Sequence, residues 1–502
     1  MSKTTRVQGN KITETITRFN DSLTTNTRNS SGFTFAKHFL NFPDRLALLP
    51  AITQDTDIDT YYALEYGDYT TYEAIVLGAN VGTKALYGVP LVENPVATSI
   101  ANATFENGSW LFKYKDTAFY YNGTSLNYMN DITGTPAETT AYKTLVKSAR
   151  TKFDFVRPFI HPTDSYAYFF GANTMYQLTD EPIASGVWTA ASATIPNNLE
   201  ICSACPFGEY IAIFAKDKEK GSTWVYIWDR SLTLETFVDV KQWVGNEVIA
   251  SGTINGNLTG ISTYSKARTD ITLAVSVYTG QSIVVQNELT PNNRSVIADA
   301  VQEKVGLDNA ITYILPRHIN GKLYFGGFNE ATNGKGQIYE VDENFEIRIP
   351  YDNGGVDVDD FIISELGVLT FLNTDNQYYY QRNVGAVDLT TEGEYITTIF
   401  DGNNGFEEKQ PDRVRAWHSP IMTGGSVKIE YWCVTNDPAN AGGWVTIGTN
   451  STAGSTRTSF NRVTSTGENM NTDQEFYYRI TADRVSFIFG FKADSHFINT
   501  PE

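Results

Sequence analysis

The chain has 502 residues, with 38 Lys and Arg against 57 Asp and Glu, which gives a formal net charge of −19. This length is enough for two or three domains. So acidic a balance argues against a general nucleic-acid-binding surface, because affinity for phosphate comes from clustered Lys and Arg. No apolar run approaches the ~18 residues of a membrane span. Charged residues are only 19%, while Tyr and Phe number 29 each, which is typical of sheet proteins with many turns.

The first 40 residues are rich in Thr, Asn and Ser and contain no apolar segment of the kind found in a secretory signal. We therefore expect synthesis in a cytoplasm. We also expect residues 1–40 to form an extended N-terminal arm; the alternative is a disordered tail. Short runs such as ITETITRF alternate like a strand that lacks a partner, which favours an arm lying on a neighbouring subunit.

One local pattern occurs seven times between residues 70 and 385: an alternating apolar run, a tight turn and another such run. The clearest copy, Ser109 to Met129, reads SWLFKY, Lys115-Asp116, TAFYY, Asn122-Gly123 and TSLNYM. An Asn-Gly between alternating runs is a strong hairpin signal, because both residues tolerate positive φ. The other copies centre on EAIVL, SYAYFF, EYIAIFA, ITLAVSVY, KLYFGGF and VLTFL.

The spacing of these copies predicts a β-propeller over residues 41–388, since blades recur about every 40 to 50 residues. Seven blades is the preferred number. Six or eight blades are the alternatives, because the long interval between the fourth and fifth copies could contain an irregularity. Two or three strands are visible in each copy, and we expect the fourth to come from the variable connections.

Two stretches interrupt the strand pattern, near residues 135–150 and 293–305. Thr135 is a candidate N-cap, followed by Pro136 at the first helical position and by Glu138 three residues after the cap. We expect both stretches to be helical insertions that project from one face of the propeller. They would make subunit contacts or cover a blade edge.

The length and spacing of the strand-like runs change between residues 389 and 502. Short strand-like runs are separated there by Gly, Asn, Asp and Ser clusters, which predicts a C-terminal β-sandwich of jelly-roll or immunoglobulin-like type. The runs are GEYITTIF, RVRAWHS, SVKIEYWC, WVTIG, EFYYRIT and SFIFGF.

The three cysteines do not form a metal or redox motif. Cys202 and Cys205 make a CxxC, but a structural zinc site needs a second pair, and Cys433 lies in another predicted domain. A redox CxxC belongs at the start of a helix in an α/β context. We expect buried free thiols.

Two acidic clusters raise the question of calcium, and for both we prefer a solvated turn. The first, QDTDIDTYY, lacks the Gly and Glu that an EF-hand loop needs at its sixth and twelfth positions. The second could supply oxygen ligands from a loop. The clusters consist of Asp55, Asp57 and Asp59, and of Asp352, Asp357, Asp359 and Asp360.

No catalytic motif stands out, so we expect no enzyme and no catalytic, cofactor-binding or metal-binding residues. His38, His161, His318, His418 and His496 are scattered and form no HExxH, and there is no nucleophile elbow or P-loop.

The segment from Asp217 to Trp224 resembles the Asp-box of sialidase-type propellers. Its Gly-x-Thr-Trp end matches, but Asp217 and Glu219 replace the Ser and Asp of that motif. An Asp-box stabilises a hairpin turn and carries no catalysis. A sialidase-like glycoside hydrolase is therefore a third hypothesis.

At its two ends the chain resembles the nozzle or tail-hub proteins of short-tailed bacteriophages. The similar segments are TRFNDSLTTNTRNSSGFTFAKHFLNF near the start, and VKIEYWCVTNDPANAGGWVTIG and QEFYYRITA near the end. The resemblance implies a structural virion protein made in the host cytoplasm, whose copies form a ring in the tail. Expected partners are other copies, neighbouring tail or adaptor proteins, and DNA that passes without specific binding. An acidic lumen would let DNA slide, since like charges repel.

The main rival hypothesis is a receptor- or glycan-binding virion protein. Its sandwich would present Trp417, Trp432 or Trp444 for stacking on sugar rings of a host surface glycan. The alternative for these tryptophans is the sandwich core. Trp444 follows two glycines and is the most plausible exposed ring of the three.

Overall fold

The computed structural model describes most of the chain. The described residues are 3–8, 11–16, 33–37, 39–42, 45–48, 52–55, 60–66, 74–80, 82–89, 98–105, 110–122, 125–145, 156–219, 221–233, 237–267, 270–289, 311–319, 321–329, 337–345, 347–352, 358–363, 369–373, 378–381, 392–397, 400–402, 406–433, 444–461 and 470–498. Within these ranges every regular element is a β-strand. The all-β prediction is therefore confirmed for them.

Seven antiparallel sheets of four strands follow one another along the chain. The first three are β7 (Thr60–Tyr66), β8 (Ala74–Asn80), β9 (Thr83–Val89) and β10 (Thr98–Asn102); β11 (Leu111–Tyr114), β12 (Thr117–Tyr121), β13 (Leu126–Asn130) and β14 (Ala137–Lys143); and β15 (Phe159–Ile160), β16 (Ala167–Phe170), β17 (Thr174–Leu178) and β18 (Trp188–Thr194).

The other four sheets are built in the same way. They are β19 (Leu199–Phe207), β20 (Tyr210–Asp217), β21 (Thr223–Trp228) and β22 (Phe237–Trp243); β23 (Glu247–Ile254), β24 (Asn257–Ala267), β25 (Asp270–Tyr278) and β26 (Ile283–Leu289); β27 (Ile311–Ile319), β28 (Lys322–Asn329), β29 (Gln337–Val341) and β30 (Ile347–Asp352); and β31 (Val358–Ile363), β32 (Leu369–Asn373), β33 (Tyr378–Gln381) and β6 (Ile52–Asp55).

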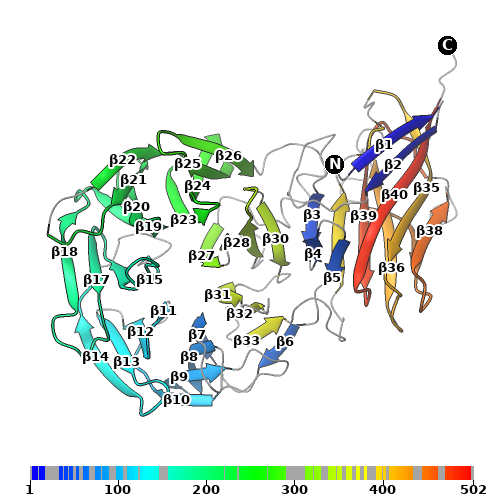
Figure 1. The fold of residues 1–502 in the computed structure, drawn as a ribbon. Helices are drawn as coiled ribbons and strands as arrows, with labels where there is room; N and C mark the ends of the chain where they lie inside the picture. The colour runs from blue at the N-terminus through cyan, green and yellow to red at the C-terminus, as the bar shows by residue number, and fades with distance from the viewer. Residues whose placement is uncertain are drawn as a thin grey trace.

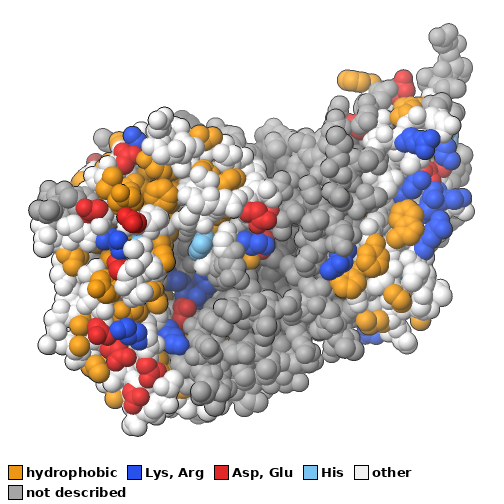
Figure 2. Space-filling view, viewed as in Figure 1, with side chains coloured by type: hydrophobic (Ala, Val, Ile, Leu, Met, Phe, Trp, Pro, Cys, Tyr) orange, Lys and Arg blue, Asp and Glu red, His pale blue; other side chains and the backbone are white. Residues whose placement is uncertain are grey.

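The seven sheets are arranged around a common centre, with the first strand of each sheet innermost (Figure 1). This is the arrangement of a β-propeller. A space-filling view shows a depression between the sheets whose wall carries Lys, Arg, acidic and His side chains (Figure 2). Neighbouring sheets pack through aromatic side chains. The ring of Phe169 in the third sheet, for example, lies 5.5 Å from Phe112 and 5.3 Å from Phe119 in the second.

All seven repeated runs of the sequence are strands of these sheets. In the clearest copy, β11 and β12 are joined by Lys115 and Asp116, and Lys115 has a φ of 53°. The carboxamide oxygen of Asn122 accepts hydrogen bonds from the backbone N–H and the hydroxyl of Ser125 in the next turn. The local hairpin signals therefore predicted these strands correctly.

The last of the seven sheets is completed from the other end of the chain. Strand β6 pairs with β33, with Asp55 opposite Tyr378 and Ile52 opposite Gln381. Strand β31 of this sheet also contacts β7 of the first sheet. An N-terminal strand thus supplies the fourth strand beside β31, β32 and β33, and it joins the two ends of the ring.

The helix predicted near residues 135–150 is wrong, because Ala137–Lys143 is strand β14. Glu138, predicted to take part in capping that helix, makes contacts within the sheet instead. Its carboxylate accepts hydrogen bonds from the Thr104 backbone N–H (2.6 Å) and from the Tyr120 hydroxyl (2.9 Å). Pairing with β13 satisfies the backbone and overrides local helix propensity. The insertion predicted at 293–305 lies outside the described residues. Where the structure is described, no helix has the length and hydropathy needed to cross a bilayer.

Two further sheets contain most of the C-terminal strands and also the N-terminal ones. The seven-stranded sheet consists of β1 (Lys3–Gln8), β2 (Lys11–Ile16), β40 (Phe487–Phe497), β35 (Lys409–His418) and β38 (Arg457–Asn461), with β5 (Arg45–Leu48) and β4 (Phe39–Phe42) attached through β40. The five-stranded sheet consists of β3 (Phe33–Lys37), β34 (Gly393–Thr397), β39 (Phe476–Asp483), β36 (Ser426–Cys433) and β37 (Val445–Asn450).

The N-terminal strands find their partners within the same chain. Strand β2, the alternating run predicted to seek a partner, pairs with β40 from Lys11 opposite His496 to Ile16 opposite Phe491. Strand β3 pairs with β34. Strands β1 to β5 therefore belong to the C-terminal sheets, and the next strand along the chain, β6, belongs to the ring of sheets.

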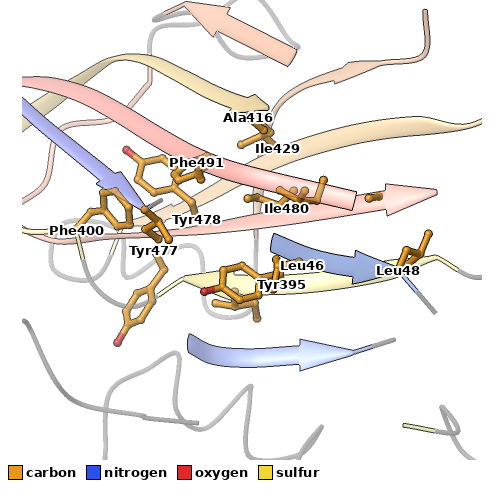
Figure 3. Close-up of a cluster of buried hydrophobic side chains, with 14 of the residues drawn as sticks. Leu46, Leu48, Tyr395, Phe400, Ala416, Ile429, Tyr477, Tyr478, Ile480 and Phe491 are labelled. Carbon is orange, nitrogen blue, oxygen red and sulfur yellow. The ribbon is translucent and has the colours of Figure 1, made fainter. Parts of the chain in front are cut away.

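The two C-terminal sheets pack against each other through large apolar side chains (Figure 3). The ring of Phe491 on β40 lies 5.2 Å from Tyr478 on β39 and 5.7 Å from Phe400. Phe491 is fully buried and Tyr478 is 1% exposed. Strands β1 and β2 form an N-terminal hairpin. This packing joins that hairpin, through β40, to the rest of the C-terminal sheets.

Candidate functional site

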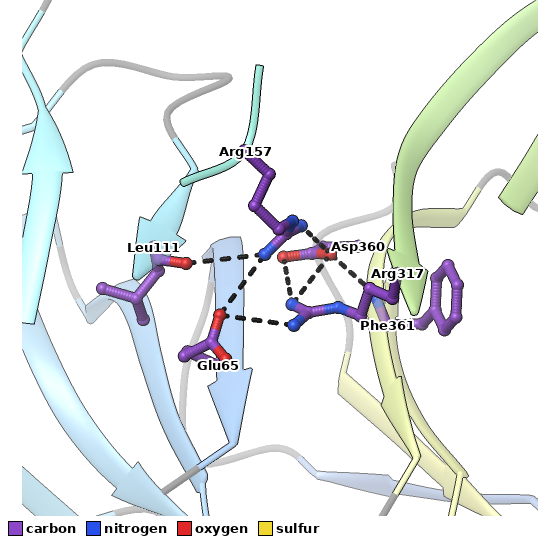
Figure 4. A network of polar contacts seen from close by, with 6 residues as sticks. All are labelled: Glu65, Leu111, Arg157, Arg317, Asp360 and Phe361. Carbon is purple, nitrogen blue, oxygen red and sulfur yellow. Dashed lines mark hydrogen bonds and ion pairs between the residues drawn. The ribbon is translucent and has the colours of Figure 1, made fainter. Parts of the chain in front are cut away.

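The centre of the ring holds four charged side chains, which we call the central ion-pair network: Glu65, Arg157, Arg317 and Asp360 (Figure 4). Glu65 is on β7, Arg317 on β27 and Asp360 on β31, while Arg157 lies just before β15. Inner strands from sheets far apart in the sequence therefore meet here. Each of these three strands is the first of its sheet in chain order, and the four charged side chains point toward one another between them (Figure 4).

Every charge in this network contacts both charges of opposite sign. Asp360 accepts from Arg157 at 2.8 Å and from Arg317 at 3.3 Å, and Glu65 lies 3.4 Å and 3.3 Å from the same two guanidinium groups. Arg157 also lies 3.5 Å from the carbonyl oxygen of Leu111 on β11. The side chains are 4 to 17% exposed, so the pairs are shielded from water.

The network suits a structural role better than a chemical one. Burial lowers the pKa of Arg317, but the carboxylates of Asp360 and Glu65 more than offset this and leave its pKa raised. A guanidinium remains charged at neutral pH in any case. The two guanidinium groups balance the two carboxylates. The network therefore holds sheets together and carries no net charge that could attract a ligand. The solvated acidic turn expected for Asp360 is therefore wrong, since Asp360 is 3% exposed and paired.

A second buried polar cluster joins the third and fourth sheets. Arg230 forms an ion pair with Asp164, which also accepts a hydrogen bond from the Tyr168 hydroxyl at 2.8 Å. Gln177 donates to the same hydroxyl at 2.8 Å. Burial raises the pKa of Tyr168, and the hydrogen bond to Asp164 adds to this. The tyrosine therefore stays protonated as a donor to Asp164.

Two buried histidines are held in their neutral form. The Nε2 of His161 donates to the Tyr210 carbonyl at 3.0 Å, while its Nδ1 accepts from the Thr163 N–H at 3.2 Å. In His418, Nδ1 donates to the Ser419 carbonyl. Both rings are at most 2% exposed, and burial lowers the pKa of each.

Acid should destabilise the protein already below about pH 6.5. The unfolded chain then binds protons at His161 and His418 that the folded chain excludes, so the free energy of unfolding falls as pH drops, by at most about 1.4 kcal/mol per pH unit for each ring. Thermal melting at constant ionic strength from pH 8 to pH 5 would measure this. In His161→Gln, which keeps one donor and one acceptor, the slope should be shallower. A flat profile down to pH 5.5 would contradict the assignment.

The cysteines are buried free thiols, as predicted. Cys202, Cys205 and Cys433 are 4%, 3% and 2% exposed. Burial raises the pKa of Cys205 to about 12. Where residues are described, no cluster of three His, Cys, Asp or Glu could hold a metal ion.

The folded chain should therefore not react with a thiol reagent at pH 8, because only the thiolate is the nucleophile. Titration with Ellman's reagent should show three equivalents after denaturation and fewer than half an equivalent before it. Rapid labelling of the native chain would mean that the strands around Cys205 open readily.

The other predicted site residues are separated in space or belong to turns. Asp217 stabilises the hairpin between β20 and β21: its carboxylate accepts from the Glu219 N–H at 2.9 Å, and Gly221 has a φ of 65°. This confirms a turn-stabilising role. Asp55 and Asp352 end strands β6 and β30, whereas Asp57, Asp357 and His38 lie outside the described residues. His318 is exposed, and its Nε2 lies 2.8 Å from the Thr253 carbonyl.

The three candidate tryptophans differ in environment. Trp432 is 2% exposed, and its ring lies 5.5 Å from Trp444 at 89°. Trp444 packs partly buried against the same core, with the Arg479 guanidinium 4.7 Å from its ring. Trp432 is therefore a core residue, and the expected exposure of Trp444 is only partial. Trp417 lies on the outer face of the seven-stranded sheet.

The fold defines a β-propeller protein with additional sheets. Similar structures include a catalytically inactive virginiamycin B lyase from Staphylococcus aureus (12% identity, 66% of this chain and 99% of that one, TM-score 0.41) and BamB from Moraxella catarrhalis (10%, 70% and 95%, 0.37). The WD40 propeller domain of Doa1 is similar at 11% identity over 67% and 96%, with a TM-score of 0.41. No family model matches the chain, and no curated protein matches it in sequence. Likeness at this level carries nothing about activity.

Proposed function

We propose that this chain is a structural protein of the tail of a short-tailed bacteriophage. Its copies form a ring-like nozzle or hub that binds neighbouring tail or adaptor proteins and lets DNA pass. In this proposal the seven four-stranded sheets are the blades of a seven-bladed propeller, and the two packed C-terminal sheets are a β-sandwich. The chain acts in the virion and is made in the host cytoplasm.

The observation that carries the proposal is that N-terminal strands pair with strands in both the ring of sheets and the two C-terminal sheets. Strand β6 completes the seventh sheet, and β2 and β3 add strands to the two C-terminal sheets. Separating the ring of sheets from the C-terminal sheets by force would require breaking strand pairs, which suits a component under mechanical load.

The proposal places the route of DNA between copies of the chain. The central ion-pair network lies in the middle of each propeller, so in this proposal DNA passes along the axis of the assembled ring and not through a single propeller. A net charge of −19 favours a lumen that repels phosphate, which allows sliding without retention.

Light scattering at several concentrations, with negative-stain images of the same sample, tests the ring. Closed rings of about six or twelve copies are expected, in line with cyclic symmetry. Trimers would instead favour a fibre or receptor-binding role, and a monomer at every concentration would contradict a ring formed by this chain alone.

A further inference from the structure

The outer face of the seven-stranded sheet is basic, in contrast to the rest of this acidic chain. Side chains that alternate away from the core on β1, β2, β40, β35 and β38 include six cations, which we call the basic face: Arg6, Lys11, Arg413, Arg415, Arg457 and Lys492. Figure 2 shows Lys and Arg side chains gathered at the right-hand edge of the molecule, with hydrophobic side chains between them.

Strand register places these cations in adjacent rows. Arg415 lies opposite Lys492 on β40, and Arg413 opposite Asp494. Asp494 lies opposite Thr13 on β2, which in turn lies opposite Arg6 on β1. Rows are separated by about 7 Å along a strand and neighbouring strands by about 5 Å. The cations are therefore close enough to act on one ligand.

Most of this positive charge is not neutralised within the sheet. Asp494 pairs with Arg415 and lies 3.6 Å from Lys492, and Asp412 pairs with His496 at 3.0 Å. These two are the carboxylates of the described face. Arg457 is exposed and forms no ion pair among the described residues. Six cations against two carboxylates leave a local excess of positive charge.

An aromatic platform lies in the middle of this charge. Trp417 is opposite Gly490 on β40 and opposite Arg457 on β38. A Cβ at Gly490 would lie 3.6 Å from Cε3 of Trp417, so the indole lies across the glycine and stays partly exposed. Phe489, next in β40, is 44% exposed. The simplest role of this Trp is to cover a glycine in the sheet, but that role requires no ring of cations around it.

We propose that the basic face binds an acidic polysaccharide of the uronic-acid type, with a sugar ring on Trp417 and its carboxylates on the flanking arginines. Arginine presents a planar fork that matches a carboxylate. Four other positions of the face carry neutral hydroxyl and amide groups suited to sugar hydroxyls: Thr13, Thr15, Ser459 and Asn461.

The aromatic surface favours a polysaccharide over a nucleic acid, whereas charge does not separate them, because a polyuronate carries one carboxylate per sugar and a nucleic acid one phosphate per nucleotide. Nucleic-acid platforms stack successive bases on several aromatic rings, whereas this face offers Trp417 flanked by Phe489. The proposal does not depend on ring formation.

Isothermal titration of the full-length chain with hexagalacturonate, maltohexaose and a thymidine oligonucleotide of equal charge tests this. Hexagalacturonate should bind best, and more weakly as salt rises. Trp417→Ala and Arg457→Glu should each lower its affinity about tenfold or more. The controls Phe406→Ala, which removes an aromatic ring that is 85% exposed, and Lys218→Glu, on the fourth sheet, should not.

Three results would overturn the proposal: no binding of hexagalacturonate at low salt, equal binding of maltohexaose, or tighter binding of the oligonucleotide. Arg457→Glu is at an exposed position, so it tests the face even if Trp417→Ala fails to fold. If Arg457→Glu instead abolished self-association while uronate binding persisted, the face would be a contact between copies.

Discussion

Replacing Asp360 with alanine is expected to lower the free energy of unfolding of the ring of sheets by about 3–5 kcal/mol. The change leaves Arg157 and Arg317 buried at the centre with Glu65 as their one remaining carboxylate, and the two guanidinium groups would then repel each other. Because the network joins β7, β27 and β31, we expect these strands to open first. Urea unfolding, with hydrogen exchange of peptides from the three strands, would measure both effects.

The matched control is the exposed pair of Lys115 and Asp180 in the second and third sheets. Its side chains are 44% and 57% exposed, and such surface pairs contribute little. Lys115→Ala should leave unfolding unchanged. If Asp360→Ala unfolded at the same urea concentration as Lys115→Ala, the central network would not be what holds the first and seventh sheets together.

Replacing Phe491 with alanine should cost about 3–5 kcal/mol and loosen the C-terminal sheets. The side chain is fully buried and packs between Tyr478 and Phe400, so its removal leaves a cavity that the paired strands cannot close. Strand β40 also pairs with β2 and β35. The N-terminal hairpin should therefore become accessible to protease in this variant.

Phe489 supplies the comparison, because it lies two residues away on the same strand, at the register shift opposite Trp417 and His418 that leaves its ring exposed instead of in the core. It is 44% exposed, so Phe489→Ala should change stability by less than about 1 kcal/mol. Limited proteolysis and thermal melting of the two variants, side by side, separate burial from the mere loss of a phenyl ring. Equal effects would mean that the core between the sheets is not formed as described.

Features encoded by neighbouring residues could be predicted from the sequence, and features that join distant segments could not. The hairpin of β11 and β12 follows from alternation and from one turn, both visible within a dozen residues. The pairing of β6 with β33 has no such local signal, since an edge strand accepts many partners. The mistaken helix at Ala137–Lys143 shows the same limit, because pairing with β13 decided its conformation.

The central ion-pair network was missed for a related reason. Arg157 and Asp360 are 203 residues apart, and the acidic cluster around Asp360 looks like a surface turn. A signal was nevertheless present: Arg157 lies in the run FVRPF and Arg317 in ILPRH. An arginine within an otherwise apolar run is costly to bury without a partner, so each one indicates a buried carboxylate elsewhere.

The pairing of β2 with β40 has a consequence for folding during synthesis. Lys11 leaves the ribosome early, but its partner His496 follows only after some 480 more residues, roughly 25 to 100 s later at ordinary elongation rates. Throughout that interval β2 has an open edge, which neighbouring nascent chains could pair with. Native structure at the N-terminus is therefore completed last, and a ribosome stalled before residue 487 would hold a chain whose β2 is paired with β1 but still lacks its second partner, β40.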